Sequence, residues 1–172
     1  IYLGGTNSAC SQPNLTPAWV TQQAAAGWNF IPTYVGLQAP SNSCGCAGIV
    51  PGQASAEGTA AAQDAIAQAQ ALGIGPGSAI YDDMEAYPLS TQNTNAVLAF
   101  LSAWTTALHA GGYLSGIYSS GNSGIRVLVS HVGTSFPEPD DIWVADWNGV
   151  ASANDPYLPS ADWPNHQRVH QY

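Results

Sequence analysis

Strand-like and helix-like segments alternate along the whole chain, and this alternation limits the possible folds more than any other feature. Short runs rich in β-branched and aromatic residues predict strands, and the Ala-rich or amphipathic stretches between them predict helices. Helices inserted between successive strands favour parallel β/α units, in a doubly wound sheet or in a barrel. The predicted strands cover residues 1–5, 30–36, 79–85, 114–119, 141–147 and 167–172, and the predicted helices cover 16–27, 55–72, 90–110 and 123–131, with Thr16 and Ser55 as candidate caps.

The length of the chain limits how such units can close. Residues 1–172 suffice for one domain with a core and are too few for two ordinary domains. An eight-stranded barrel takes at least about 200 residues, and this sequence starts and stops on a predicted strand. If the sheet is a barrel, we expect a single domain truncated at both ends, which lacks the first β/α unit and the last strand. The two outer strands would then flank the gap, beside the cleft.

Basic side chains are almost absent. Arg126 and Arg168 stand against eleven acidic residues, and the net charge is −9. A nucleic-acid partner needs a basic surface, and anionic membranes repel an acidic chain. No apolar run reaches the roughly 18 residues of a membrane span, and no signal peptide is visible, whether it was removed or never present. The many neutral polar residues suit a secreted or cell-wall-associated protein with a glycan partner, although a GC-rich genome also explains scarce lysine. The oligomeric state stays open.

The cysteine count is odd, with Cys10, Cys44 and Cys46, so one cysteine lacks a partner within the chain. The C-x-C spacing is tight for a bridge between Cys44 and Cys46, so we expect Cys10 to pair with one of them if the chain is exported. A zinc site is the alternative, although no His is near the pair in sequence. The four histidines show no metal-ligand spacing, and we expect no metal or organic cofactor.

Three acidic residues, Asp82, Asp83 and Glu85, gather at the end of the predicted strand 79–85. Strand alternation places Asp83 and Glu85 on one face with Tyr81, and Asp82 on the other. In a barrel the first set points inward, at the strand end where such barrels build active sites. The Cα atoms of two residues so spaced are about 6.5–7 Å apart, which brackets the carboxyl separations of retaining and inverting glycosidases. Two close carboxyl groups also differ in pKa, so that one stays protonated as a general acid. The alternative is an acidic strand end that caps a helix or binds a cation.

Aromatic and amide side chains recur at the other strand ends. Sugar sites combine aromatic platforms with neutral hydrogen-bonding groups, because a sugar ring has apolar faces and hydroxyl edges. Each aromatic residue taken alone fits a core position better than a sugar platform, and only the recurrence at strand ends favours a cleft. The candidate substrate-binding residues are Tyr34, Tyr87, Tyr118, Asp146, Trp147, Asn148 and Gln171.

The string Ile80–Tyr87 (IYDDMEAY) resembles the hallmark of the bacterial glycoside-hydrolase-like domain family of unknown function numbered 1906. Residues 1–10 (IYLGGTNSAC), residues 32–40 (PTYVGLQAP), and the pair 141–149 with 166–172 are also similar, so the resemblance covers essentially the whole chain. More distantly, Asp83-x-Glu85 is similar to the Asp-x-Glu of family 25 lysozymes, which cleave peptidoglycan on a similar barrel.

This resemblance implies an α/β fold of the TIM-barrel type in an exported, cell-wall-associated protein. It assigns the general-acid role to Glu85, and to Asp83 the stabilisation of an oxocarbenium-like charge or the positioning of an N-acetyl group. Two acidic strands of the family, at the start and at the end, are not present in this sequence, and Asp82 stands where an aromatic residue is expected.

We therefore expect a glycoside hydrolase that acts on a bacterial cell-wall glycan of the peptidoglycan type. A non-catalytic glycan-binding domain on the same scaffold is the main alternative, and a fragment without activity is the third. The sequence leaves the glycan, the linkage and the stereochemistry open.

Overall fold

The computed structural model describes residues 1–172 and contains one six-stranded sheet and four α-helices. The strands are β1 (Tyr2–Gly4), β2 (Thr33–Tyr34), β3 (Ala79–Asp83), β4 (Leu114–Ser120), β5 (Asp141–Ala145) and β6 (Arg168–Gln171). The helices are α1 (Pro17–Ala25), α2 (Ala54–Ala71), α3 (Thr91–Ala110) and α4 (Arg126–Val129), with a 3₁₀ turn η1 (Pro51–Gln53) before α2 and a π-helical turn η2 (Gly121–Ile125) before α4. The predicted alternation of strands and helices is confirmed.

Every strand pairs in parallel with the next strand of the sequence, so the sheet order is β1-β2-β3-β4-β5-β6. A doubly wound sheet would reverse its order at a switch point, whereas this order runs in one direction, as in a barrel. The strands β1 and β6 do not pair with each other and remain edges. Nevertheless Tyr2 of β1 and Gln171 of β6 line the same pocket, because the sheet curls. The fold is barrel-like α/β, without a closed ring of strands.

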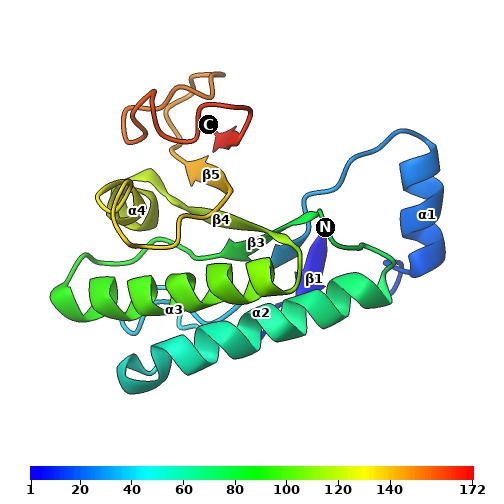
Figure 1. Ribbon diagram of the computed structural model, residues 1–172, viewed down its shortest axis with the longest axis horizontal. Helices are drawn as coiled ribbons and strands as arrows, with labels where there is room; N and C mark the ends of the chain where they lie inside the picture. Colours follow the sequence, from blue (N-terminus) through cyan, green and yellow to red (C-terminus); the bar gives the residue numbers. More distant parts are fainter.

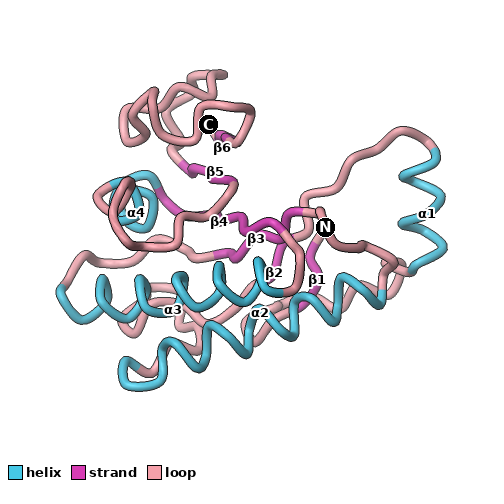
Figure 2. The backbone as a smooth tube through the Cα atoms, in the orientation of Figure 1, coloured by secondary structure: helices cyan, strands magenta, loops and turns pink.

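The two long helices cover the outer face of the sheet (Figure 1). They lie side by side, and their apolar side chains meet those of the central strands, with Phe100 and Trp104 of α3 fully buried beside Ile80 and Ile117. Helix α1 projects from the body at the β1 side, and long loops surround β6 at the opposite end (Figure 2). No helix has both the length and the apolar character that crossing a membrane requires.

Local sequence signals explain most helix ends. Thr16 and Ser90 cap α1 and α3, since their hydroxyl groups accept hydrogen bonds from Trp19 N and Asn93 N. The prediction that Ser55 caps α2 is wrong, because η1 feeds directly into a helix that already begins at Ala54 without a side-chain cap. Strand β2 is only two residues long, and it begins directly after Pro32, which has no N–H to donate.

The prediction of a bridge to Cys10 is also wrong. Cys44 and Cys46 form a disulfide with each other, and Cys10 is a free, exposed thiol. A turn at Gly45, with φ +69°, brings the Cα atoms of the pair to 5.2 Å, which is within the range that a disulfide spans. Glycine adopts this left-handed backbone without strain.

Helices α2 and α3 come into close backbone contact at Gly58. A Cβ atom at this position would lie 2.2 Å from the carbonyl oxygen of Phe100. We expect Gly58→Ala to lower the free energy of unfolding by about 1–3 kcal/mol, because the helices must separate. This loss outweighs the helix-propensity gain of about 0.5–1 kcal/mol. Urea unfolding measures the difference, with Gly52→Ala as the control, since nothing lies within 4 Å of a Cβ atom there. Equal stability of the two variants would contradict the close approach.

Candidate active site

A small pocket of about 60 Å³ opens at the carboxyl ends of the strands, inside the curl of the sheet. It contains both predicted catalytic residues, Asp83 and Glu85, and two of the predicted substrate-binding residues, Tyr118 and Gln171. Strand alternation explains this arrangement, because residues 81, 83 and 85 share the inner face of β3 and its extension. The remaining lining residues are Tyr2, Thr33 and Trp143.

The two carboxyl groups differ in environment. Asp83 is 7% exposed, whereas Glu85 is exposed at the mouth of the pocket. The Asp83 carboxyl is within hydrogen-bonding reach of the Glu85 carboxyl, and Oδ1 of Asp83 receives no hydrogen bond from any N–H or hydroxyl group. Burial, the charge of Glu85 and the hydrogen bond with it raise the pKa of Asp83 to about 7. Asp83 therefore keeps its proton up to about neutral pH.

Aromatic rings line the pocket beside these carboxyl groups, and Tyr118 is the register partner of Asp83 on the neighbouring strand. Trp143 packs edge-on against Tyr118 at 5.1 Å and against Tyr81 at 6.2 Å, measured between ring centroids. The hydroxyl of Tyr118 donates a hydrogen bond of 2.9 Å to Oε1 of Gln171, which joins β4 to β6 across the pocket. Burial and the two nearby carboxylates raise the pKa of Tyr118 to about 12, so this donor keeps its proton.

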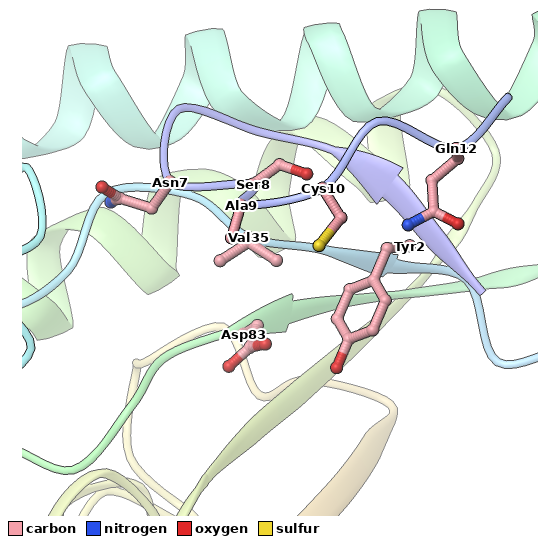
Figure 3. A pocket seen from close by; sticks show the side chains of 8 residues that line it. All are labelled: Tyr2, Asn7, Ser8, Ala9, Cys10, Gln12, Val35 and Asp83. Atoms are coloured by element: carbon pink, nitrogen blue, oxygen red, sulfur yellow. The ribbon is translucent and has the colours of Figure 1, made fainter.

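A second pocket of about 280 Å³ adjoins the first and shares Tyr2 and Asp83 with it (Figure 3). Its other walls come from the loop after β1, including Asn7, Cys10 and Gln12, and from Val35 after β2. Asp83 lies at the junction of the two pockets. A ligand that extends from Glu85 into the larger pocket would pass over this carboxyl group.

Asp82 has no part in either pocket. Its register partner in β2 is Tyr34, which faces the helices, and a Cβ atom at Gly36 would lie 3.0 Å from its Oδ1. The side chain is fully buried, and neither carboxyl oxygen has a hydrogen-bond partner. Burial, and secondarily the charge of Asp83, raises the pKa of Asp82 well above its ordinary value, so this side chain is a neutral acid in the core.

The structure moves Tyr34 away from the predicted cleft. Parallel neighbours in register point to the same face, and Tyr34 pairs with Asp82, whereas Thr33 pairs with Tyr81. The ring of Tyr34 packs 5.8 Å from that of Trp104, and its hydroxyl donates to Oδ2 of Asp64 at 2.8 Å. The prediction that Tyr34 lines the cleft is therefore wrong, and Thr33 takes that place.

Tyr87 is likewise a core residue. It is buried outside both pockets, and a Cβ atom at Gly124 of the π-helical turn would lie 3.7 Å from its ring. Burial raises the pKa of the Tyr87 hydroxyl, which has no hydrogen-bond partner. The prediction of a substrate-binding Tyr87 failed because the chain leaves the strand direction after Glu85.

The residues that follow β5 also lie outside the two pockets. Trp147 is 75% exposed, and the side-chain amide of Asn148 donates to Oδ2 of Asp146 at 2.9 Å. Asp146 continues the outer face of β5, on which Val144 pairs with His170. Its carbonyl oxygen is 2.9 Å from Nε2 of His170. These residues form an exposed turn beside β6 and do not contact Asp83 or Glu85.

Sequence reasoning missed four residues of the site. Tyr2, Thr33 and Trp143 line the pocket, and the alternation of β1, β2 and β5 could have indicated them if the inner face of each strand had been known. Gln38 lies behind the pocket and holds the backbone of Asp83 and Glu85. No sequence signal marks it. No group of three or more His, Cys, Asp or Glu side chains could hold a metal ion.

A curled parallel sheet with two carboxyl groups at a strand end, inside an aromatic-lined pocket, defines a glycoside-hydrolase-like α/β protein. The Rv2525c-like, glycoside hydrolase-like domain matches residues 1–172, so the chain belongs to this family and the family expectation from sequence is confirmed. No curated protein matches the chain.

Two solved structures have a similar fold. One is an uncharacterized B. stearothermophilus protein, with 20% identity and a TM-score of 0.58 over 99% of this chain and 75% of that chain. The other is the Mycobacterium tuberculosis Tat-secreted protein Rv2525c in complex with L-tartrate, with 15% identity and a TM-score of 0.63 over 91% of this chain and 71% of that chain. At these identities the likeness is one of fold.

Proposed function

We propose that this chain is a glycoside hydrolase that acts on a bacterial cell-wall glycan, with Glu85 and Asp83 as its acid pair. One observation carries the proposal: a buried carboxyl group and an exposed one line the same aromatic-lined pocket at the end of a parallel strand. The family membership supports the same reaction class.

The arrangement suits proton transfer to a glycosidic oxygen. Asp83 holds a proton up to about neutral pH, and Glu85 is the member of the pair that is exposed to a ligand. That proton passes through Glu85 to the leaving oxygen as the C–O bond breaks, and the two resulting carboxylates stabilise the oxocarbenium-like charge. Water then adds to the anomeric carbon and returns a proton to the pair. Tyr2 and Tyr118 supply apolar faces for sugar rings, and Gln171 supplies an amide for hydroxyl groups.

An extracellular location agrees with this substrate. The Cys44–Cys46 disulfide fits an oxidising compartment, and the net charge of −9 makes anionic polymers such as nucleic acids unsuitable partners. The fold neighbour Rv2525c is described as Tat-secreted. We propose that this chain, too, is secreted or associated with the cell wall.

A glycan-binding domain without catalysis is the second candidate. Glycosidases hold their two carboxyl groups about 5–9.5 Å apart, on either side of the scissile bond. Here the two groups contact each other instead, so a hydrolase of this type needs another group or the substrate itself to assist at the anomeric carbon.

One assay separates the two candidates. We expect the protein to release reducing ends from purified peptidoglycan, at a rate that falls as the pH rises through about 7, because the acid pair then loses its proton. Co-sedimentation with the insoluble glycan is measured in parallel. Sedimentation without release would favour the binding domain, and neither signal on peptidoglycan or chitin fragments would contradict both candidates.

A further inference from the structure

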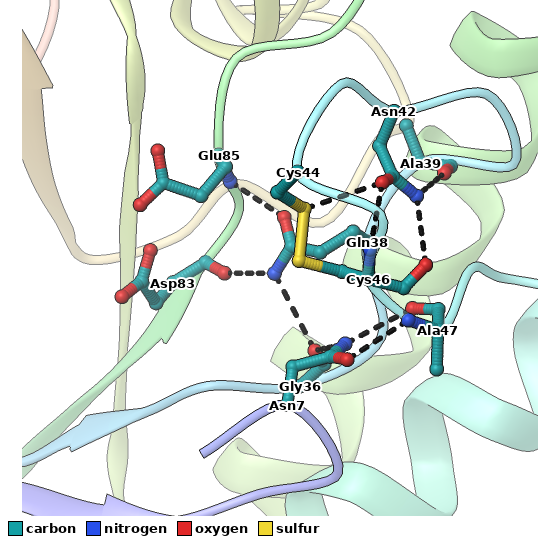
Figure 4. The surroundings of a disulfide bond; sticks show 10 residues. All are labelled: Asn7, Gly36, Gln38, Ala39, Asn42, Cys44, Cys46, Ala47, Asp83 and Glu85. Carbon is teal, nitrogen blue, oxygen red and sulfur yellow. Dashed lines mark hydrogen bonds between the residues drawn. A yellow bond between two sulfur atoms is a disulfide. The ribbon is translucent and has the colours of Figure 1, made fainter. Parts of the chain in front are cut away.

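A buried glutamine holds the backbone of the carboxyl pair from behind the pocket. Gln38 is 1% exposed and follows β2. Its side-chain Nε2 donates a hydrogen bond of 2.6 Å to the carbonyl oxygen of Asp83, and its Oε1 accepts one of 2.7 Å from the amide N–H of Glu85 (Figure 4). Both hydrogen bonds go to main-chain groups, so the Gln38 carboxamide does not compete with a ligand for the carboxylates.

The side-chain carboxamide of Gln38 makes the two hydrogen bonds that the backbone of a residue in a neighbouring parallel strand would make. In a parallel ladder, one residue binds the carbonyl oxygen before and the N–H after the residue that it faces. Gln38 makes this pair of bonds around Met84, beyond the point where β2 ends at Tyr34. On the other side, Met84 N donates to the carbonyl oxygen of Tyr118 at 3.0 Å. The chain therefore continues as a strand through Glu85, although its strand neighbour on the β2 side is a side chain.

Gln38 is itself held by the disulfide loop, the segment that follows β2 and contains the Cys44–Cys46 bridge. Its backbone N–H donates to the carbonyl oxygen of Ala47, and its carbonyl oxygen accepts from Ile49 N, so Gln38 is paired with the returning limb of the loop. Asn7 joins the two limbs from outside, with bonds from its side-chain amide to the carbonyl oxygens of Gly36 and Ala47. Figure 4 shows the Cys44–Cys46 bridge beside this arrangement.

We propose that Gln38 is a positioning residue that keeps Asp83 and Glu85 in extended conformation, so that their carboxyl groups meet on the pocket side. Two residues separated by one point to the same face only while the backbone between them is extended. Glu85 lies beyond the last residue of β3, and the bond to Gln38 is the one that its N–H makes. The role concerns the carboxyl pair itself, and it holds whether the site cleaves a glycan or only binds one.

The test is the titration of Asp83 in Gln38→Met, which keeps the length of the side chain and removes the hydrogen bonds to Asp83 and Glu85, together with a longer one of 3.4 Å from Nε2 to the carbonyl oxygen of Gly36. We expect the pKa of Asp83 to fall from about 7 towards its ordinary value, because Glu85 moves away and its charge and hydrogen bond are lost. The fall is partial, since burial remains. Carbon-13 NMR of the labelled carboxyl groups measures this pKa without any substrate, so the outcome does not depend on hydrolysis.

Two further variants exclude a general loss of stability as the cause. Thr105→Val removes the buried hydrogen bond between Thr105 and Ser115 at the far end of β4, and we expect it to lower stability while the pKa of Asp83 stays unchanged. Gln38→Asn keeps a carboxamide that is one methylene too short, and it serves in place of Gln38→Met if that variant does not fold. An unchanged Asp83 pKa in a folded Gln38 variant, or an equal fall in Thr105→Val, would overturn the positioning role.

Discussion

Glu85→Gln is expected to lower the release of reducing ends from peptidoglycan by about 10²–10⁴-fold, the usual contribution of a positioned general acid. Glutamine has almost the shape of glutamate but cannot pass a proton to the leaving oxygen. Because Glu85 is exposed at the pocket mouth, and its bonds are those of its backbone N–H to Gln38 and of its carboxyl group with Asp83, the substitution leaves the packing of the core unchanged. Initial rates across pH 4–9 give the measurement.

The matched control is Glu138→Gln, in the loop before β5. The Glu138 side chain is bound to Gly133 N and has no place in the pocket, so this variant is expected to retain wild-type rates. Circular dichroism and urea unfolding establish that both variants are folded. Wild-type turnover by folded Glu85→Gln would remove Glu85 from the proposed mechanism, whereas loss of rate in Glu138→Gln would show that the effect is not local.

Alternation along β3 was sufficient to predict the carboxyl pair, because that strand is long enough for its inner and outer faces to be read from the sequence. The same reasoning failed for Tyr34. Strand β2 has only two residues. Its register with Tyr81 and Asp82 decides which of its side chains faces the pocket, and no local sequence pattern determines that register. The six parallel strands, and the gap between the outer strands β1 and β6, were predictable from the alternation of elements and the length of the chain.

Contacts that join distant segments were beyond a single sequence. Gln38 binds residues 45 and 47 positions further along the chain, at Asp83 and Glu85. The Cys44–Cys46 bridge depends on a left-handed glycine between the two cysteines, which the spacing alone does not indicate. Residue type did not indicate exposure either. Trp143 and Trp147 belong to the same segment, but only Trp143 lines the pocket, whereas Trp147 is exposed.

Asp82→Asn is expected to increase the free energy of unfolding at neutral pH and to change its dependence on pH. Asp82 is fully buried without a hydrogen-bond partner and is held neutral, with a pKa well above the ordinary value. The unfolded chain ionises it near pH 3.9, so unfolding releases a proton and stability falls as the pH rises above about 4. The slope reaches about 1.4 kcal/mol per pH unit for each such group.

Asp83 contributes a slope of the same sign, but only up to its pKa of about 7. Asp83→Asn should therefore flatten the stability curve between about pH 4 and 7, whereas Asp82→Asn should remove the separate decline that Asp82 causes from about pH 4 up to its own raised pKa. Urea unfolding of the wild type and the two variants at a series of pH values separates these contributions. Parallel curves for the wild type and Asp82→Asn would mean that Asp82 is ionised in the folded protein, and a neutral acid in the core would then be excluded.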